Sequence, residues 1–402
     1  MTENQKQPDS ETQDDNSNGV LFLRHPKAIE NPIEWYSSKI AGVPFILRNL
    51  LTLKRAGIKT LAVFIEDPNG NLKKSFEKIL KDSRLPKNIP WINNIPQLKE
   101  WIQNNPAYIL NGSALHDKKE LHGLIHSNAK NERASAFPIN PEKLNKLLLD
   151  NPTAIQSQQA DFPIYVPGAT EAQIQEPEDF KRLHEIQVGG SGLSHDSAIT
   201  RILSRPASRL LTRMFLNTPV SPNQITLLSF FLGLVSAFLF LQGSYGTSVI
   251  AAMLLVLSTW VDGADGEIAR LKFMETDIGK KLDIYCDNII HFLVFTAIGC
   301  GVYFKTDESI FLYLGGLAGL GGLTAFFILS PILLDKRSPN NQLFHISEPE
   351  LAEKFANRDF IHFLLLVAVV DQMEIFIAVA AVGANLFAGY LVYSRLLKLK
   401  TA

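Results

Sequence analysis

Polar and apolar residues divide the chain into two parts. Residues 1–213 carry charged side chains at ordinary density, whereas residues 214–261 contain no Asp, Glu, Lys or Arg. That uncharged run is longer than two membrane-spanning helices of about 20 residues each. The pattern therefore predicts a soluble part followed by an integral-membrane part, and it excludes a wholly soluble protein.

The first 187 residues show the alternation of an α/β domain. Residues 1–19 form a polar tail that lacks the apolar side chains needed to offset ordering entropy, so we expect it to be disordered. Within the domain, residues 20–187, apolar runs predict strands at 20–23, 60–65 and 108–110. Helical periodicity predicts helices at 43–56, 72–80 and 143–149. This alternation predicts a mainly parallel sheet with helices on its faces.

Two short segments join this domain to the membrane part. Residues 188–197 begin with a Gly-rich stretch and are interpreted as a linker. In residues 198–216, Arg201, Arg205, Arg209 and Arg213 recur every four residues beside apolar side chains, which predicts an interfacial amphipathic helix. A solvated basic face is the alternative, which the membrane span that follows disfavours.

The membrane part, residues 217–402, contains six apolar segments. Two fill the uncharged run around a hairpin at 243–246, and the others lie at 279–304, 310–334, 360–370 and 375–394. The segment at 360–370 is short for a span. With six spans, the proposed outer loops carry only Lys305, and the other basic residues between spans fall on the opposite side. The positive-inside rule then predicts a cell inner or plasma membrane protein with the soluble domain and both termini in the cytoplasm.

Composition narrows the function classes. The 402 residues include 39 basic and 40 acidic side chains, a net charge of −1 that gives no support for nucleic-acid binding. Two cysteines, Cys286 and Cys300, exclude a disulfide scaffold or a Cys-rich zinc site and are interpreted as packing residues. The polar N-terminus lacks the apolar core of a cleavable signal peptide.

Four aspartates lie beside the second and third spans. Asp262 and Asp265 are three residues apart and Asp283 and Asp287 four, so each pair shares one helix face. Carboxylates in membrane helices are costly unless paired or metal-bound, which favours a functional site. An all-oxygen cluster suits Mg²⁺ or Mn²⁺ rather than zinc.

The same residues resemble a known signature. The pattern Asp-x2-Asp-Gly-x2-Ala-Arg-x8-Gly-x3-Asp-x3-Asp is typical of CDP-alcohol phosphotransferases (phosphatidyltransferases), and residues 262–287 fill every fixed position. The resemblance covers about residues 197–400 and implies a domain of six membrane helices. It also implies transfer of a substituted phosphate from a CDP-alcohol to an acceptor hydroxyl, with release of CMP.

The resemblance further implies a role for each matching residue. Asp262 and Asp283 would bridge two divalent ions, Mg²⁺ or Mn²⁺, while Asp265 and Asp287 would each complete one metal site. Asp287 would also be the general base. The CDP group would contact Gly266, Ala269, Arg270, Thr276 and, at the start of the first span, Pro222, Asn223 and Thr226. A plain helix cap at Ser221 or Asn223 is compatible with that role.

The acceptor site and the assembly are less distinct. For an acceptor phosphate Arg395 is the first candidate, with Arg205, Arg209, Lys336, Arg337 and Arg358 as others, although positive-inside anchoring explains each of them equally well. His291 follows Asp287 by one turn and is interpreted as a packed polar residue. Gly315 and Gly319 predict a close helix contact, within one chain or between two. The resemblance implies a homodimer through this region.

The N-terminal domain resembles sugar nucleotidyltransferases around residues 40–65, where a Gly-x-Pro helix precedes a strand. Relatives exist that fuse such a domain to the membrane transferase, as inositol phosphate cytidylyltransferase and di-inositol phosphate phosphate synthase. The catalytic pieces differ here. Residues 23–27 contain no glycine to wrap a triphosphate, and Ser113 stands where the metal-binding Asp is expected. Lys27 is at most a remnant of the loop, so this domain is interpreted as degenerate.

The sequence therefore favours a membrane CDP-alcohol phosphotransferase of phospholipid biosynthesis with a degenerate nucleotidyltransferase-like domain. Three alternatives remain open at this point: a bifunctional cytidylyltransferase and CDP-inositol transferase, a cation transporter with intramembrane carboxylates, and an inactive scaffold. The transporter would not need Gly266, Ala269 and Arg270 at fixed spacing. The scaffold would not need all four aspartates.

Overall fold

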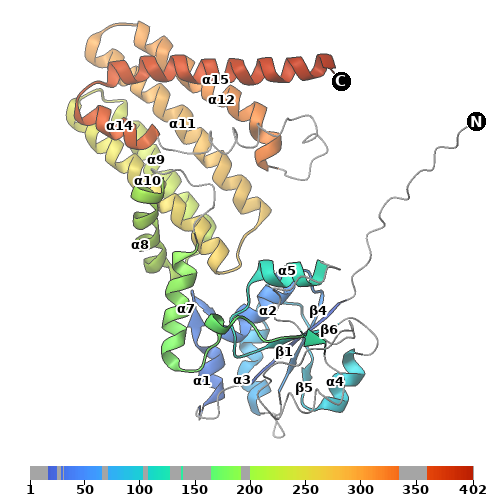
Figure 1. Cartoon of the computed structure of the whole chain (residues 1–402). Coiled ribbons are helices and arrows are strands. Elements are labelled where there is room, and N and C mark those ends of the chain that lie inside the picture. The colour runs from blue at the N-terminus through green and yellow to red at the C-terminus, as the bar shows by residue number, and fades with distance from the viewer. Residues whose placement is uncertain are drawn as a thin grey trace, which may run out of the picture. The chain divides into compact units, whose positions relative to one another are not determined.

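The protein is described here from a computed structural model, in which the chain forms two compact units, residues 1–187 and 188–402. We describe each unit by itself (Figure 1). The described residues are 17–24, 29, 31–65, 71–102, 107–126, 137–138, 164–191, 200–334 and 360–401. Most of the tail, the helix predicted at 143–149, Lys27, Lys336, Arg337 and Arg358 lie outside the described residues.

The first unit is built on a mainly parallel sheet, as the sequence predicts. Its strand order is β5-β4-β1-β6-β8-β7, and only β7 runs antiparallel to its neighbour. The strands are β1 (Asn18–Phe22), β4 (Thr60–Phe64), β5 (Trp91–Ile92), β6 (Ala107–Asn111), β7 (Phe137–Pro138) and β8 (Ile164–Val166). β1 begins at Asn18, two residues before the predicted start of the domain at residue 20. A small hairpin, β2 (Lys39–Ile40) and β3 (Val43–Pro44), precedes the second helix.

Helices cover both faces of this sheet. They are α1 (Pro32–Ser37), α2 (Phe45–Arg55), α3 (Asn71–Leu80), α4 (Ile95–Ile102), α5 (Lys118–His126), the 3₁₀ turn η1 (Thr170–Ala172) and α7 (Pro177–Gly189). Leu98 and Ile102 of α4 pack on one face of the sheet with Phe22 and Phe64. Val188 and Gly189 end α7, so the first two residues of the predicted linker are helical.

A polar network closes the carboxyl end of β6, beside β1. In open α/β sheets, ligands bind outside the carboxyl ends of strands where the strand order reverses, which here is between β1 and β6. His116 Nε2 lies 2.8 Å from the Asn111 carbonyl oxygen, and Asn49 donates to the carbonyl of Ala114 at 2.9 Å. Ser113 lies near the buried hydroxyl of Tyr36. This edge is therefore occupied by the protein's own contacts.

The second unit is helical. Its elements are the π-helical turn η2 (Thr200–Ser204), α8 (Arg205–Leu216), α9 (Pro222–Phe240), α10 (Tyr245–Leu271), α11 (Asp277–Thr306), α12 (Ile310–Leu334), α14 (Phe360–Val369) and α15 (Met373–Thr401). Figure 1 shows α9, α10, α11 and α12 running side by side. Among the described residues, five helices are long and apolar enough to cross a membrane, namely α9, α10, α11, α12 and α15.

One of the six predicted spans is not confirmed. The predicted fifth span is the helix α14, which has only 10 residues. A helix of that length rises about 15 Å, half of the about 30 Å hydrocarbon core. Ile361, Leu364 and Ala368 of α14 are nonetheless buried in the same apolar core as α10 and α11. Six full spans are therefore not confirmed, although the limits of the other five agree with the sequence pattern.

The helix ends and contacts follow from local chemistry. Ser221 caps α9 in a reciprocal capping box with Gln224, which confirms the cap expected there. A Cβ at Gly299 would lie 2.6 Å from the Gly315 Cα, so these two glycines let α11 and α12 approach closely. A Cβ at Gly319 would likewise meet Phe292 of α11 at 2.8 Å. The predicted glycine stripe thus makes its contact within one chain.

We expect His116 to give the first unit a pH-dependent stability. Burial lowers its pKa to about 4, whereas the unfolded chain should titrate near 6.5. Between these values the unfolded state binds the extra proton, so stability is lost as the pH falls from 6.5 towards 4. The loss should reach about 2 kcal/mol at pH 5.

The measurement is thermal unfolding of the full chain followed by tryptophan fluorescence. Three of the four tryptophans, Trp35, Trp91 and Trp101, lie in the first unit. His116→Gln keeps a donor for the Asn111 carbonyl and should remove most of the difference between pH 7 and pH 5. An unchanged difference in that variant would contradict the assignment.

Candidate active site

Three of the predicted carboxylates come together between α10 and α11. Oxygen atoms of Asp262, Asp265 and Asp283 all lie within 4.8 Å of one another, and they form the only such acidic group among the described residues. Asp262 and Asp265 are each 5 % exposed, and Asp283 is partly buried. Three carboxylates this close repel strongly in a poorly hydrated setting. The arrangement therefore favours a bound cation.

Side chains of α9 form hydrogen bonds to two of these carboxylates. The Thr226 hydroxyl donates to Asp265 Oδ2 in a short hydrogen bond, and the Ser229 hydroxyl donates to Asp262 Oδ1 at 3.3 Å. Ser258 donates to the Ser229 carbonyl at 2.7 Å and ties α10 to α9 once more. Thr226 belongs to the predicted site, whereas Ser229 was missed. Its spacing of three residues from Thr226 is the signal that would have placed it on the same face.

The start of α11 brings the signature residue Gly279 together with two residues expected to contact the CDP group, Asn223 and Thr276. Thr276 caps α11 and accepts from the Gly279 N–H at 3.0 Å. A Cβ at Gly279 would lie 2.7 Å from Asn223 Oδ1 and 2.9 Å from Thr276 Oγ1. Only glycine fits at this position because the two side chains from α9 and the α10–α11 connection converge on it. Asn223 and Thr276 are exposed and thus accessible to a ligand.

Arg270 is held in place by a residue that the sequence pattern does not reveal. Its Nε and Nη2 donate to the Ser191 carbonyl at 3.1 and 2.9 Å. A Cβ at Gly266 would lie 3.2 Å from Arg270 Nη1, so the guanidinium folds back over that glycine. No sequence signal identifies Ser191, because a backbone carbonyl carries no residue type.

Asp287 follows Asp283 by one helical turn on α11 and is partly buried. The described carboxylates that lie within 4.8 Å of one another do not include it. Of the four predicted aspartates, Asp287 is thus the one outside this close group. His291, the next residue along this face, packs edge-on against the Phe360 ring at 5.2 Å.

A buried carboxylate that sequence reasoning missed lies two residues beyond Asp265. Glu267 has a side chain with 0 % exposure and accepts from Arg205 Nη1 at 2.9 Å. The hydroxyls of Ser208 and Thr212 donate to the same carboxylate at 3.0 and 2.8 Å. The available sequence signal for Glu267 was a single acidic residue in an apolar helix. It stands at a position that the signature does not fix, on the face turned away from Asp262 and Asp265.

The described candidates for binding an acceptor phosphate differ in their surroundings. Arg205 forms the buried ion pair with Glu267, which gives it a structural role. Arg209, one turn later, has a buried Nε with no hydrogen-bond partner among the described residues. Arg395 is exposed on α15.

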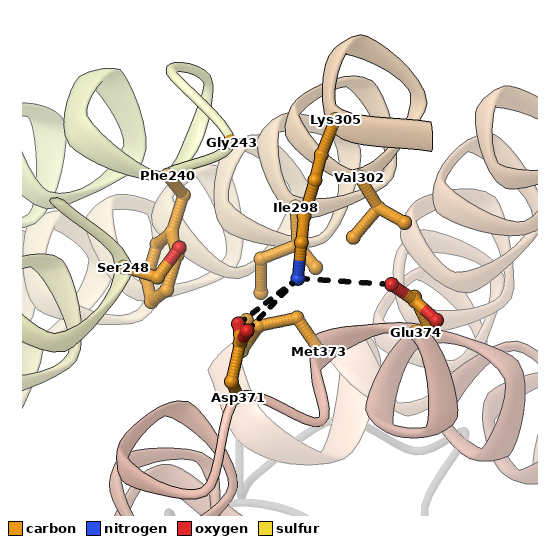
Figure 2. Close-up of a pocket in the computed structure, with 9 residues that line it drawn as sticks. All are labelled: Phe240, Gly243, Ser248, Ile298, Val302, Lys305, Asp371, Met373 and Glu374. Carbon is orange, nitrogen blue, oxygen red and sulfur yellow. Dashed lines mark hydrogen bonds and ion pairs between the residues drawn. The ribbon is translucent and has the colours of Figure 1, made fainter. Parts of the chain in front are cut away.

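A separate pocket lies at the other end of the helices. It is lined by Phe240, Ser248, Met373 and an ion-pair group in which Lys305 Nζ lies 3.0 Å from Asp371 and 3.8 Å from Glu374 (Figure 2). Lys305 follows Asp283 by 22 residues of α11, a rise of about 33 Å. The pocket is therefore distant from Asp262, Asp265 and Asp283, and no signature residue lines it.

The donor set of the acidic cluster fits a hard divalent cation. The described carboxylates supply several oxygens within a small volume, and neither cysteine nor histidine is needed to complete the group. Oxygen-only sites of this kind bind Mg²⁺ or Mn²⁺ in preference to softer metals. Asp262, Asp265 and Asp283 are the residues that would hold the ion.

Comparison with known proteins agrees with this geometry. Residues 219–342 match the sequence model of the CDP-alcohol phosphatidyltransferase family. These residues are therefore similar to a CDP-alcohol phosphatidyltransferase domain. The resemblance expected from the signature is confirmed, and the residues matched include all four aspartates.

Several curated proteins are similar to the chain. The bifunctional IPC transferase and DIPP synthase of Archaeoglobus fulgidus is 34 % identical over 152 residues, 37 % of this chain and 29 % of that protein. Its namesake from Thermococcus kodakarensis is 30 % identical over 165 residues, 40 % and 35 %. An uncharacterized protein of Aquifex aeolicus is 40 % identical over 100 residues, 25 % and 49 %. The chain therefore spans only 29–35 % of the two bifunctional relatives' own length.

Removing divalent metal should destabilise the helical second unit. Without a cation, Asp262, Asp265 and Asp283 repel one another, so the unfolding temperature should fall after chelation and recover when Mg²⁺ is restored. Differential scanning fluorimetry of detergent-purified protein, with metal content checked by elemental analysis, measures the shift.

Asp262→Asn is the matched variant, because it removes one repelling charge and should shrink the chelator-dependent shift. An identical shift in wild type and variant would contradict a metal at these carboxylates.

Proposed function

We propose that the chain is an integral-membrane transferase that moves a substituted phosphate from a CDP-alcohol to an acceptor hydroxyl and releases CMP. The observation that carries the proposal is the convergence of Asp262, Asp265 and Asp283, within the matched family domain. An accessible polar edge near this group is formed by Asn223 and Thr276 beside the signature residue Gly279. An enzyme that handles a pyrophosphate needs such a combination of cation site and open polar edge.

The chemistry is an in-line displacement at phosphorus. The acceptor oxygen forms a bond to the β-phosphorus, the bridging P–O bond breaks, and CMP leaves with that electron pair. Asp287, one helical turn beyond Asp283, accepts the proton of the acceptor hydroxyl. Because a carboxylate is a weak base, its placement next to the hydroxyl must supply much of its efficiency.

A pair of divalent ions, Mg²⁺ or Mn²⁺, would clamp the pyrophosphate and offset the charge that develops on the leaving phosphate. In this proposal Asp262 and Asp283 would help to hold both ions, while Asp265 would complete the ligands of one and Asp287 those of the other. Thr226 and Ser229 keep Asp265 and Asp262 in position by hydrogen bonds.

The remaining signature residues would bind the CDP group. Gly266 and Ala269 leave room along α10, and Arg270 offers donors for a phosphate next to Gly266. Asn223 and Thr276 border the same edge, while Pro222 begins α9 and fixes its entry. Arg209 and Arg395 are the proposed contacts for an acceptor phosphate, with Arg209 supported by its unpaired, buried Nε in the described part of the chain.

We also propose the setting of this activity. The enzyme lies in the cell inner or plasma membrane with both termini cytoplasmic, which the distribution of basic residues supports. It forms a homodimer and contributes to phospholipid biosynthesis, with a CDP-diacylglycerol or CDP-polyol donor and an alcohol or polyol phosphate acceptor. Assays with each donor class against a panel of acceptors identify the substrates.

A bifunctional enzyme is the second candidate, because similar proteins are named bifunctional IPC transferase and DIPP synthase. The first unit disfavours it here. Residues 107–113, which contain β6 and its carboxyl end, include Asn111 and Ser113 but no Asp or Glu, and both residues face contacts within the unit. A cation transporter fits less well, because its carboxylates would not need the converging Asn223, Thr276 and Gly279.

Asp287→Asn should abolish CMP release while leaving binding of the CDP-alcohol largely intact. The substitution removes the base and one ligand of one metal, whereas the other three aspartates remain. The measurement is CMP release by chromatography together with donor binding by calorimetry. Asp277→Asn, an exposed acid at the start of the same helix, is the control and should keep activity. Turnover at the wild-type rate in Asp287→Asn would refute the assignment of the base.

The full chain should not convert CTP and a polyol phosphate into a CDP-alcohol. The reason is the absence of a carboxylate at the end of β6 and of a glycine in residues 23–27. Pyrophosphate release from CTP, followed by a coupled enzymatic assay, checks this. CTP-dependent release that survives Asp287→Asn would support the bifunctional alternative.

A further inference from the structure

Glu267 is the one acidic residue of the α10 signature segment that faces away from the metal cluster. At about 100° per residue, its side chain points roughly 140° from that of Asp262 and 160° from that of Asp265. It is completely buried and accepts hydrogen bonds from Arg205, Ser208 and Thr212, all on α8. The signature of the family does not specify this position.

The three donors to the Glu267 carboxylate are spread over almost two turns of α8. Arg205 and Thr212 are seven residues apart, about 10 Å along α8. Such a spread fixes both the tilt and the axial position of α8 against α10. Next to this contact, a Cβ at Gly263 would lie 3.2 Å from the Ser208 Cβ, so the two helices also meet closely at their backbones.

The opposite side of α10 is held by α9 through Thr226 and Ser229, which bond the metal-facing carboxylates directly. Residues 262–270 are therefore clamped between two helices. A carboxylate site needs its ligands fixed to within a fraction of an ångström, and rotation of this helix segment would move Asp262 and Asp265 together away from Asp283.

We propose that Glu267 is a positioning residue: its buried contact with α8 sets the rotation of α10 and so holds Asp262 and Asp265 in register with Asp283 for a divalent cation. The inference rests on the proposed function for the identity of the cluster as a metal site. In addition to any role at the membrane surface, α8 would thus stabilise the site by contacting the face of α10 that is turned away from Asp262 and Asp265.

The test is Mn²⁺ binding to the full chain in detergent, measured from the free-ion signal in electron paramagnetic resonance. Thr212→Val removes one donor to Glu267 without changing charge. Arg205→Gln removes the cationic donor, and by charge alone it should tighten Mn²⁺ binding. The positioning role predicts the opposite sign, so both variants should raise the Kd by about three- to tenfold, less than the about 10- to 100-fold for a group bonded to a metal ligand.

Two matched controls isolate the contact. Thr324→Val makes the same substitution at a hydroxyl that bonds only within α12. Arg213→Gln removes the same charge from α8 at an exposed position. Both should leave the Kd unchanged or slightly lower. Circular dichroism and gel filtration establish that each variant is folded, and where Arg205→Gln is not, Thr212→Val and Ser208→Ala decide.

Folded Thr212→Val and Arg205→Gln with wild-type or tighter Mn²⁺ binding would overturn the positioning role. Failure of the wild-type chain to bind Mn²⁺ would instead contradict the proposed metal site itself. Reduced transfer activity with an unchanged Kd would show a role of α8 in a later step and would likewise overturn the inference.

Discussion

The membrane unit is organised around the repulsion between carboxylates that its fold forces together. Asp262, Asp265 and Asp283 lie within 4.8 Å of one another on two apolar helices. Hydrophobic burial would not place like charges at such a distance, because each buried carboxylate loses hydration and gains an unfavourable neighbour. The helices must therefore be held by other contacts, and the divalent cation that we propose would offset the repulsion between the carboxylates.

Those other contacts are polar and close. Thr226 and Ser229 bond the carboxylates from α9, and Glu267 anchors α10 from behind through α8. Where α11 meets α12, Gly299 and Gly315 allow backbone contact. In lipid the hydrophobic effect contributes little between helices, so small residues and hydrogen bonds must supply the specificity of packing. The residues that preorganise the site are thus the ones that hold the helices together.

Sequence reasoning recovered the signature residues and the limits of five long helices, because apolar length and fixed spacing are direct consequences of helix geometry. It also located α14, but an apolar run of 10 residues does not confirm a sixth span. It missed Glu267 and Ser191, since neither a buried salt bridge nor a backbone carbonyl leaves a periodic trace. Arg205 illustrates the same limit: its place in a basic stripe indicated a surface residue, while its partner lies 62 residues away in the chain.

The two ends of α11 show how charge can be tolerated next to an apolar interior. At one end the acids form a cluster whose charge a divalent cation would offset in the function that we propose. At the other end, about 33 Å away by helical rise, Lys305 is neutralised by Asp371 and Glu374. That separation matches the about 30 Å hydrocarbon thickness of a bilayer. Lys305, the one basic residue that the charge pattern assigns to the outer side, thus carries no unbalanced charge. A single basic residue on that side leaves the more numerous basic residues near the aspartate cluster to set the orientation that we propose.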